Sequence, residues 1–344
     1  MKKIKIDFCG FWNGFDKTEN LLSDILKERY EIEISKHPDF LIVSVFGQPF
    51  SYMNHDCVRI LYTGEPLSPD FSVFDYAIGF DKIVLLDSEG KNRYYRYPFC
   101  FYHFDRVNQC TKGMSYQQAR EALNEKNRFC NFIYGHPSAK GEREAIFEAL
   151  GKYKRVDAAG SFLNNMPGGK VIPFTEEKVE FQRKCKFTIS CESIRYPGFV
   201  TEKIIDPIRA HSIPIYYGNP CIEEEFSPEA MINLHSFSSL EEGIERVIQI
   251  DQDDALYLKM MAAPKLVSDD YLEKMYEGLK EFLFSIFDQE RNDAYRRLRF
   301  YVQKHHEDCL REYSQFYNSP EYHMFKTRQR IEKRLIRTAE KKSK

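Results

Sequence analysis

The sequence predicts an α/β fold of two Rossmann-like domains that face a cleft, followed by a helical segment at the C-terminus. First, 344 residues are enough for about two domains of roughly 150 residues each. Second, two successive stretches alternate short apolar runs with helical patterns. This alternation is typical of βαβ units and of a mostly parallel sheet. In such sheets ligands bind outside the carboxyl ends of the strands.

The first half of the chain begins with a strand predicted at 3–11 and a helix at 20–29. Further strands are predicted at 40–46, 58–62 and 76–80. The run FLIVSVF at 40–46 is almost wholly apolar, which indicates a strand buried on both faces. The loop TGEPLSPDF follows the strand at 58–62. We assign residues 1–115 to the first domain.

An aromatic cluster, RYYRYPFCFYHF, lies at 93–104 around Pro98. Its side chains either pack a loop against the sheet or form a stacking wall for a sugar, and the sequence leaves both interpretations open. The polar, weakly helical segment at 108–127 favours a crossing between the two domains.

The second half starts with a strand at Arg128, and we assign 128–270 to the second domain. The strands that follow are predicted at 186–191 and 212–217. Helices are predicted at 141–150 with Gly151 as the residue after the end, 176–184, 201–210 with a kink or early stop at Pro207, 240–250 and 254–261. A helical extension at 271–325 and a tail at 326–344 complete the chain.

Composition and charge exclude several classes of protein. The formal net charge of −2 lacks the basic excess of nucleic-acid-binding proteins. The nine cysteines include no CxxC pair, which favours buried free thiols in a reducing compartment over a zinc ribbon or a thioredoxin motif. Asp7 interrupts any signal-peptide core, and no run reaches the roughly 18 apolar residues of a membrane span. We therefore expect a cytoplasmic protein.

The tail is the exception in charge. Residues 326–344 hold nine Lys and Arg against two Glu, so the tail carries +7 and the remainder −9. Met324, Ile331, Leu335 and Ala339 recur at helical spacing. A basic amphipathic helix of this kind favours binding to an anionic membrane surface, on the inner face of the cytoplasmic membrane; the alternative is a solvated basic terminus.

Several familiar motifs are missing from the sequence. It has no GxGxxG, no GxxxxGK[ST], no GxSxG and no HExxH. The triplet Asp251-Gln252-Asp253 has the DxD form that holds a divalent metal in other sugar-nucleotide enzymes. Here it lies between two predicted helices, where acidic residues are common at helix starts. We therefore predict no metal ligand in the chain and no required cofactor, although a non-essential divalent metal stays open.

The most informative stretch is 187–234, in which a strand ends in Cys191-Glu192-Ser193 and a short loop leads into a helix that opens Val200-Thr201-Glu202-Lys203. The first N–H groups of a helix are unpaired and its dipole is positive there, so this arrangement can bind an anion. Lys203 adds a point charge for a diphosphate, and Glu202 can accept hydrogen bonds from sugar hydroxyls. The alternative is an ordinary βαβ unit with a capping Thr201 and a surface Glu–Lys pair.

This stretch resembles the signature of the alpha-1,3/1,4-fucosyltransferases that use GDP-fucose, especially the bacterial enzymes of Lewis-antigen type. The shared pattern is F-x-x-x-x-E-[NS]-x-x-x-x-G-[YF]-V-T-E-K. A second block, RILYTGEPLSPDFSVFDYAIGFD at 59–81, and a third, GEREAIFEAL at 141–150, resemble family segments in the same order. The resemblance covers about 59–262 and implies the GT-B arrangement, with the acceptor bound by the first domain and GDP-fucose by the second. The family's heptad repeats are absent.

The resemblance implies a role for each matching residue. Glu65 matches the general base, and Arg143 matches an arginine that contacts the GDP phosphates. Lys203 matches the diphosphate lysine, and Glu202 matches a carboxylate near the transferred sugar and the ribose. Three further donor-site positions are Ser193, where many members have Asn, Phe199, where many have Tyr, and Thr201.

These roles imply an inverting alpha-1,3-fucosyltransferase that acts on the GlcNAc of N-acetyllactosamine-type acceptors and makes a Lewis x type product on surface polysaccharide. Inversion needs one in-line displacement, with a carboxylate that deprotonates the acceptor hydroxyl. The sequence leaves open whether type 1 or type 2 chains are preferred. It also leaves open another GT-B sugar-nucleotide transferase, or a catalytically silent protein that binds glycans or nucleotides.

Overall fold

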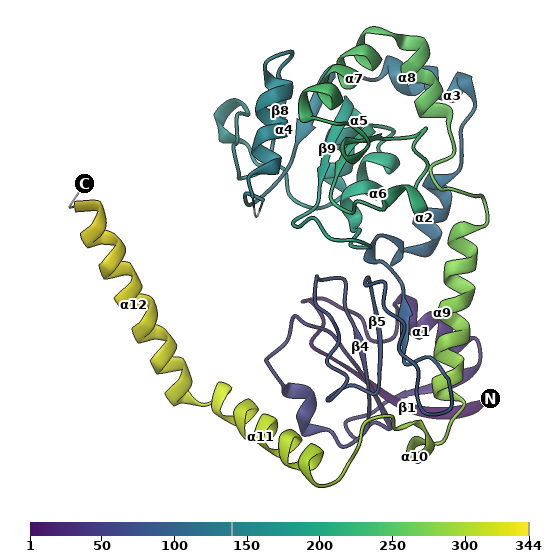
Figure 1. Cartoon of the computed structure of the whole chain (residues 1–344), viewed down its shortest axis with the longest axis vertical. Helices are drawn as coiled ribbons and strands as arrows, with labels where there is room; N and C mark the ends of the chain where they lie inside the picture. The colour runs from purple at the N-terminus through teal and green to yellow at the C-terminus, as the bar shows by residue number, and fades with distance from the viewer. Residues whose placement is uncertain (139, 343–344) are drawn as a thin grey trace. The chain divides into compact units, whose positions relative to one another are not determined.

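The computed structural model describes residues 1–138 and 140–342, which form two compact units (Figure 1). Unit 1 comprises Met1–Gly79, Val84–Tyr95 and Lys280–Lys344. Unit 2 comprises Phe80–Ile83 and Arg96–Leu279. The boundary between the units therefore lies near Arg96 instead of in the crossing expected at 108–127. The last 65 residues return to unit 1 instead of forming a separate extension.

Unit 1 is built on a six-stranded sheet in the order β2-β1-β3-β4-β5-β6. The pairs from β2 through β5 are parallel, as the βαβ pattern predicts. Every residue of β3 and β4 is buried, which explains their apolar sequences. The strands are β1 (Lys2–Cys9), β2 (Tyr30–Ile34), β3 (Phe40–Val43), β4 (Val58–Tyr62), β5 (Tyr76–Gly79) and β6 (Tyr94–Arg96).

Two of these strands end earlier than the sequence predicts. β1 stops at Cys9 because Gly10 adopts a left-handed backbone conformation with φ of +74°. β3 stops at Val43, and the apolar run continues as a loop through Phe46. Apolar periodicity alone does not distinguish a strand from an apolar loop that follows it.

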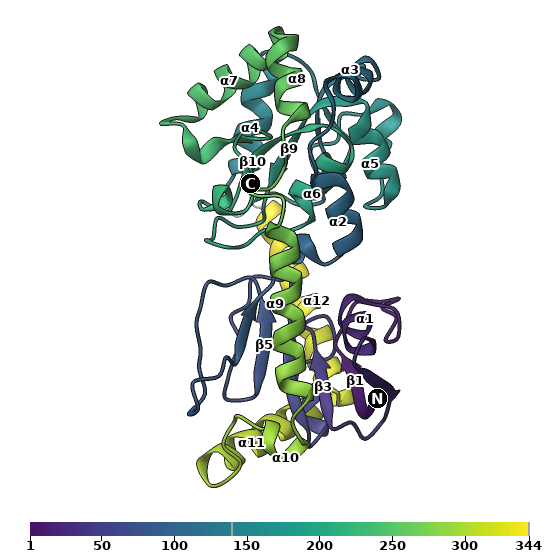
Figure 2. The same ribbon diagram turned by 90° about the vertical axis from the view of Figure 1, so that its right-hand side faces the viewer.

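The helices of unit 1 come from both ends of the chain. Asn20 caps the N-terminus of α1 (Leu21–Lys27), since its side chain accepts hydrogen bonds from the backbone N–H groups of Leu22 and Ser23. The C-terminal part of α9 (Tyr271–Phe287) runs along the sheet, where Phe282 contacts Tyr76 and Phe287 contacts Phe40 (Figure 2). The remaining helices are α10 (Arg291–Ala294), α11 (Val302–Tyr317) and α12 (Pro320–Lys342).

Unit 2 contains a five-stranded parallel sheet in the order β11-β10-β9-β7-β8. Its strands are β7 (Arg128–Phe132), β8 (Val156–Ala158), β9 (Cys185–Cys191), β10 (Ile213–Tyr217) and β11 (Ile232–Asn233). Its helices are α2 (Phe104–Thr111), α3 (Tyr116–Asn124), α4 (Glu142–Gly151), α5 (Glu176–Arg183), α6 (Glu202–Arg209), α7 (Leu240–Gln252) and α8 (Asp254–Ala262).

Helices cover both faces of the unit 2 sheet. α4 packs beside α7, and α5 beside α6 (Figure 1). Side chains alternate along a strand, so Phe187 and Ile189 of β9 join the core with Ile146 and Val247, whereas Thr188 points toward the α5 side. This doubly wound arrangement is the Rossmann-like domain that the sequence predicts for the second half of the chain.

Two details of helix ends differ from the sequence-based expectation or refine it. Gly151 is the last residue of α4 instead of the residue after it, and Lys152 forms the cap. Pro207 lies inside the last turn of α6, which ends two residues later at Arg209. No helix in the described ranges is long and apolar enough to cross a membrane.

Candidate active site

A polar pocket of about 270 Å³ lies where β7 and β9 of unit 2 reach their carboxyl ends. Residues of the loop after β7, of α4, of α5 and of the N-terminus of α6 line it. Arg143, Glu202 and Lys203, which the sequence assigns to donor binding, all lie on its wall. The fold therefore brings together residues that are about 60 positions apart in the sequence, at the sheet edge where parallel sheets bind ligands.

Lys203 is held between two carboxylates at the start of α6. Its Nζ lies 3.4 Å from Glu192 Oε2 and 3.1 Å from Glu202 Oε1, and it donates a hydrogen bond of 2.9 Å to Thr201 Oγ1. Glu192 is buried completely, Lys203 is one-fifth exposed, and Glu202 is nearly half exposed. Glu202 is thus the member of the cluster that solvent, or a ligand, reaches most easily.

Glu192 organises the backbone on which this cluster rests. Its carboxylate accepts hydrogen bonds from the Thr201 backbone N–H at 2.8 Å and from Thr201 Oγ1. The side chain has room because residue 218 is glycine, since a Cβ there would lie 2.6 Å from Glu192 Cγ. Glu192 therefore links the end of β9 to the N-terminus of α6. This link fixes the position of the backbone that carries Lys203.

The ionisation of the cluster follows from burial and from these neighbours. Burial would lower the pKa of Lys203, but the Glu192 and Glu202 carboxylates outweigh it, and the pKa is raised. Burial would raise the pKa of Glu202, but Lys203 and Lys178 outweigh it, and the pKa is lowered. For Glu192, burial prevails over Lys203 and raises the pKa. Lys203 and Glu202 consequently stay charged at neutral pH.

Arg143 supplies a second positive charge from the first turn of α4. Its guanidinium donates to the Cys191 carbonyl through Nε (3.3 Å) and Nη2 (3.1 Å), and to the His136 carbonyl through Nη1 (3.1 Å). The guanidinium also lies 4.2 Å from the Tyr134 ring centroid. Arg143 forms no ion pair with any carboxylate in the described part of the chain. Its charge is therefore balanced only by carbonyl dipoles and an aromatic ring, which leaves it able to pair with an anion.

The floor of the pocket carries amide groups that the sequence analysis did not single out. Asn131 and Gln182 are at most 1% exposed, and their side-chain oxygens accept no hydrogen bond from any residue that the structure describes. Lys178 of α5 also lines the pocket, with its Nζ 2.8 Å from Asp206 Oδ2. Unpaired buried acceptors are costly, which makes them candidates for contact with a ligand's donor groups or with water.

The other three predicted donor-site residues do not line the pocket. Thr201 is 5% exposed, and its hydroxyl is bonded to Glu192. Phe199 is 2% exposed and packs edge-to-face against Phe80 at 5.2 Å, so it contributes to the interior of unit 2. Ser193 is exposed on the loop after β9. Thr201 and Phe199 are therefore bonded and packed within unit 2 and do not face the pocket.

Glu65 lies in unit 1, in the loop directly after β4. Its side chain is exposed. The Thr63 hydroxyl accepts a hydrogen bond from the Glu65 backbone N–H at 3.0 Å, and the Glu65 carbonyl accepts one from Leu67 N–H at 2.7 Å. The loop is therefore a bonded turn that presents the carboxylate at the carboxyl edge of the unit 1 sheet.

The two aspartates of the DxD triplet bond to side chains and backbone groups of unit 2. Asp251 accepts from Lys154 at 2.5 Å and from Lys186 at 2.8 Å. Asp253 caps α8 by accepting from the N–H groups of Ala255 and Leu256. Among the residues that the structure describes, no group of three or more His, Cys, Asp and Glu side chains is placed to hold a metal ion.

Of the two interpretations of the aromatic cluster around Pro98, the structure favours packing over a stacking wall for a sugar. Tyr97, Phe101 and Tyr102 are at most 6% exposed. Phe101 stacks on Phe226 at 5.9 Å, and the Tyr97 hydroxyl donates to the Phe101 carbonyl. These rings fill the interior of unit 2 and are not available to stack on a sugar.

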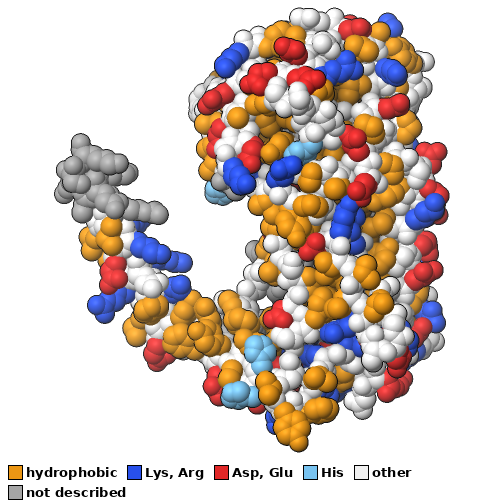
Figure 3. Space-filling model, in the orientation of Figure 1, with side chains coloured by type: hydrophobic (Ala, Val, Ile, Leu, Met, Phe, Trp, Pro, Cys, Tyr) orange, Lys and Arg blue, Asp and Glu red, His pale blue; other side chains and the backbone are white. Residues whose placement is uncertain are grey.

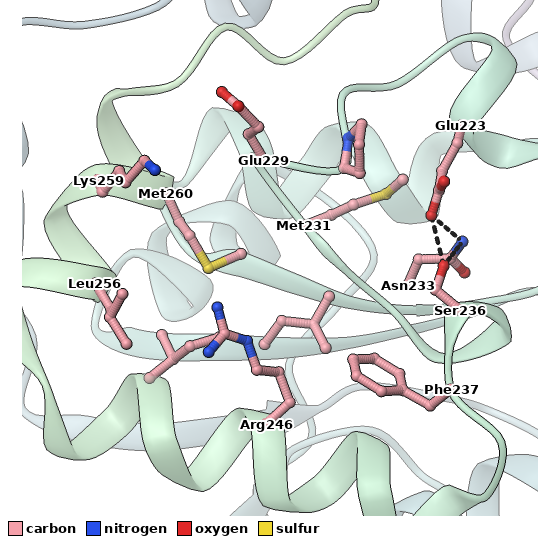
Figure 4. Close-up of a pocket in the computed structure, with 13 residues that line it drawn as sticks. Glu223, Glu229, Met231, Asn233, Ser236, Phe237, Arg246, Leu256, Lys259 and Met260 are labelled. Atoms are coloured by element: carbon pink, nitrogen blue, oxygen red, sulfur yellow. Dashed lines mark hydrogen bonds between the residues drawn. The ribbon is translucent and has the colours of Figure 1, made fainter.

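A second pocket, of about 260 Å³, lies beside the edge strand β11 (Figure 4). Met231, Met260, Leu256 and Phe237 give it an apolar lining. Its main carboxylate, Glu223, already accepts hydrogen bonds from Asn233 at 2.7 Å and Ser236 at 2.6 Å (Figure 4). Glu223, Asn233 and Ser236 are thus paired with one another, while the charged residues Arg246, Lys259 and Glu229 also lie on the wall.

Comparisons with known proteins agree with the motifs. A family model for the N-terminal domain of alpha-(1,3)-fucosyltransferase FucT matches residues 6–104. A model for glycosyltransferase family 10 (fucosyltransferase), C-terminal part, matches residues 123–264. Together the two matches cover more than half of the chain, and each includes residues of the candidate site.

Individual relatives give the same picture. The chain is similar to alpha-(1,3)-fucosyltransferase FucT of Helicobacter pylori, with 29% identity over an alignment of 317 positions that covers 80% of this chain and 63% of the relative. Alpha-(1,3)-fucosyltransferase B of Drosophila melanogaster is 25% identical over 178 residues, 45% of this chain and 40% of the relative. The chain thus spans less than two thirds of the length of these curated relatives.

A solved structure is similar over most of the chain. The crystal structure of an alpha1,3-fucosyltransferase with GDP-fucose superposes with a TM-score of 0.64 at 26% sequence identity. The match covers 82% of this chain and 91% of that one. It therefore includes both α/β units.

Proposed function

Because the chain belongs to the glycosyltransferase family 10 fucosyltransferases, we propose that it transfers L-fucose from GDP-fucose to a hydroxyl group of a glycan. The observation that carries this proposal is the convergence of Arg143 and Lys203 on one pocket at the carboxyl edge of the unit 2 sheet. Two cations beside a helix N-terminus suit a diphosphate, which carries concentrated negative charge and leaves during the reaction.

In the proposed donor complex, Lys203 and Arg143 contact the diphosphate and stabilise the charge that builds on GDP as it departs. Glu202, the half-buried carboxylate of the cluster, lies next to the transferred sugar and the ribose. A carboxylate there stabilises the positive charge of an oxocarbenium-like transition state, by analogy with glycoside hydrolysis. Ser193, on the exposed loop after β9, is the remaining predicted donor contact.

We assign the role of general base to Glu65. In an inverting displacement its carboxylate takes the proton of the acceptor hydroxyl while that oxygen bonds to C1 of fucose. The bond between C1 and the phosphate oxygen breaks, GDP takes the electron pair, and a β-linked donor gives an α-linked product. An exposed carboxylate in a bonded turn at a strand end is suited to meet an acceptor that arrives from solvent.

For the acceptor we propose the GlcNAc of an N-acetyllactosamine-type glycan, fucosylated at O3 to give a Lewis x type product on lipopolysaccharide or other surface glycans. The support is that two of the relatives, and the similar solved structure, are named as alpha-1,3-fucosyltransferases. Lacto-N-biose, in which O4 is the free position, is the competitor that the assay must include.

We further propose that transfer needs no divalent metal. The support is that the DxD carboxylate Asp251 is neutralised by two lysines, whereas Arg143 and Lys203 provide positive charge at the diphosphate position. Dialysis against EDTA should leave the rate within about twofold, because the charge compensation comes from side chains.

We also propose a cytoplasmic location on an anionic membrane surface. In the described part of α12, Met324, Ile331 and Leu335 are exposed, and basic side chains accompany them along the helix (Figure 3). The side chains of 337–342, and residues 343–344, belong to the predicted tail but lie outside the described residues. All nine cysteines are free thiols, which fits a reducing compartment.

The test of the proposed chemistry is the substitution Glu65→Gln, which keeps the shape of the side chain and removes its basicity. We expect kcat to fall by about 10²–10⁴-fold, the usual contribution of a general base, while GDP affinity stays unchanged. Glu89→Gln is the matched control, since Glu89 is an exposed carboxylate of the same unit that pairs only with Lys91. Equal loss of activity in both variants, or full activity of Glu65→Gln, would remove Glu65 from the mechanism.

A further inference from the structure

Four aromatic side chains gather at the carboxyl edge of the unit 1 sheet. Phe11, Trp12 and Phe15 come from the loop after β1, and Phe46 comes from the loop after β3. We call these four residues the aromatic platform. Trp12 is the single tryptophan of the chain.

The rings of the platform touch one another in a continuous series. Phe11 stacks on Phe15 with centroids 4.0 Å apart, Trp12 meets Phe15 edge-on at 5.2 Å, and Trp12 lies 6.2 Å from Phe46. Despite these contacts the platform is open to solvent. Phe46 is 50% exposed, and Phe11, Trp12 and Phe15 are only half-buried.

The platform forms because the loop after β1 and the loop after β3 approach each other closely. Phe46 N–H donates to the Gly10 carbonyl at 2.7 Å. A Cβ on Gly10 would lie 2.4 Å from the Ser44 carbonyl oxygen, and a Cβ on Gly47 would lie 2.5 Å from Gly10 Cα. Only glycine at both positions lets the loops meet this closely. An ion pair between Lys17 and Asp7 then fastens the far end of the first loop to β1.

The platform is continuous with the strand that leads to Glu65. Phe11 lies parallel to Tyr62 with an interplanar angle of 7° and centroids 6.1 Å apart. Tyr62 is the last residue of β4, three residues before Glu65. The pairing of β1 with β3 and of β3 with β4 brings all three carboxyl ends to one edge.

We propose that the aromatic platform binds the acceptor glycan, with Trp12 and Phe46 stacked against the apolar face of a pyranose ring next to the Glu65 loop; this inference rests on the proposed function. A pyranose has a face of C–H groups and a rim of hydroxyls. The half-buried indole of Trp12 and the exposed ring of Phe46 suit the face, and Glu65 with exposed Asn13 offers polar partners for the rim. Because this unit lacks the donor pocket, the sugar that the platform receives is the acceptor.

The single tryptophan makes the proposal directly measurable. Addition of N-acetyllactosamine to the wild-type protein should change the intensity or the emission maximum of Trp12 in a saturable way. This readout needs neither donor nor turnover. A saturable response supports the platform, and an unchanged spectrum at acceptor concentrations that saturate transfer overturns it.

Variants separate acceptor binding from chemistry. Trp12→Ala and Phe46→Ala should each raise the KM for the acceptor about fivefold, because aromatic contacts contribute on the order of 1 kcal/mol. Acceptor-independent hydrolysis of GDP-fucose should be unchanged, and Trp12→Phe should retain much of the affinity. Phe300→Ala is the matched control, since Phe300 is an exposed ring of the same unit outside the platform.

The outcomes distinguish this inference from the function on which it rests. Normal transfer with an unchanged acceptor KM in Trp12→Ala overturns the platform and leaves the transferase. A wild-type protein that transfers no fucose overturns the proposed function, and saturable Trp12 quenching by the glycan would still support a binding platform. A rise in KM for Phe300→Ala equal to that for Trp12→Ala would contradict a specific role for the platform.

Discussion

At the scale of single residues, Lys203 is the charge on which the proposed donor site depends most. It is held by two carboxylates and a hydroxyl, and these contacts raise its pKa, so it is a fixed ammonium at neutral pH. We expect Lys203→Ala to weaken GDP binding by about 10–100-fold, the usual range for a lost charge-assisted hydrogen bond.

Titration calorimetry with GDP measures this effect. The exposed Lys152→Ala, on the same unit, serves as the control and should bind GDP as the wild type does. The melting temperature of Lys203→Ala must be recorded beside it, because the substitution leaves Glu192 without its cation. Wild-type GDP affinity in a folded Lys203→Ala protein would contradict the assignment.

The sequence identified Arg143, Glu202 and Lys203 because they lie in contiguous motifs at predicted helix starts. Glu192 stands in the same motif as Lys203, but its bonds to Thr201 could not be inferred from it. Lys178, Asn131 and Gln182 were not identified, because they come together only when β7, β9 and α5 are adjacent. The aromatic platform was missed for a similar reason. Aromatic residues are most frequent at 93–104, and this frequency suggested a sugar-binding wall there. The frequency of rings in a sequence does not distinguish buried Tyr97 from exposed Phe46.

At the scale of elements, the segment between α9 and α11 is tied to the unit 1 sheet by a buried ion cluster. Arg297 pairs with Asp75, at the start of β5, and both side chains are at most 2% exposed. Asp75 also accepts from the backbone N–H groups of Arg59, Arg296 and Arg297 at 2.8–3.0 Å. Glu307 of α11 bonds to Arg297 at 2.8 Å and to Arg59 at 3.2 Å.

Breaking this cluster should therefore destabilise unit 1 strongly. We expect Arg297→Ala to lower the free energy of unfolding by about 3–5 kcal/mol, since it leaves Asp75 buried without its cation. Arg299→Ala, which removes the exposed pair with Asp56 and a contact of the guanidinium with the Tyr295 ring at 4.0 Å, should cost about 1 kcal/mol or less. Urea denaturation of both variants gives the comparison. A similar loss in the two would show that the buried cluster does not hold the segment.

The long strands and helices were predictable because each carries its own periodic pattern. The short strands β6, β8 and β11 were not, since two or three residues are too few to show a period. The five-residue strand β2 was also missed, because glutamates alternate with its apolar residues and only Tyr30 is buried. β1 ends one residue before Gly10, earlier than predicted. This early end depends on a close contact of Gly10 with Ser44, which the sequence around Gly10 does not reveal.

At the scale of the whole molecule, the α/β class and the two-unit organisation follow from the sequence, but the path of the chain does not. Residues 280–344 belong to unit 1, although they follow unit 2 in the sequence. The contacts that place them there, such as Arg297 with Asp75, join residues 222 positions apart. Such pairs leave no trace in composition or periodicity.

The basic tail is the second feature at this scale. We expect the full-length chain to sediment with phosphatidylglycerol vesicles at low salt and to be released at high salt, because each Lys or Arg near an anionic surface contributes about 1 kcal/mol. Deletion of 326–344 should abolish sedimentation and leave transfer to a soluble acceptor unchanged. Phosphatidylcholine vesicles are the control. Vesicle binding by the truncated chain would contradict the role of the tail.

The central claim is tested most directly by incubating the purified protein with GDP-fucose and either N-acetyllactosamine or lacto-N-biose, and determining the product linkage by NMR. We predict an α-linked fucose on O3 of GlcNAc from N-acetyllactosamine, formed without added metal. Formation of a β-linked product, or GDP binding without transfer to either glycan, would contradict it.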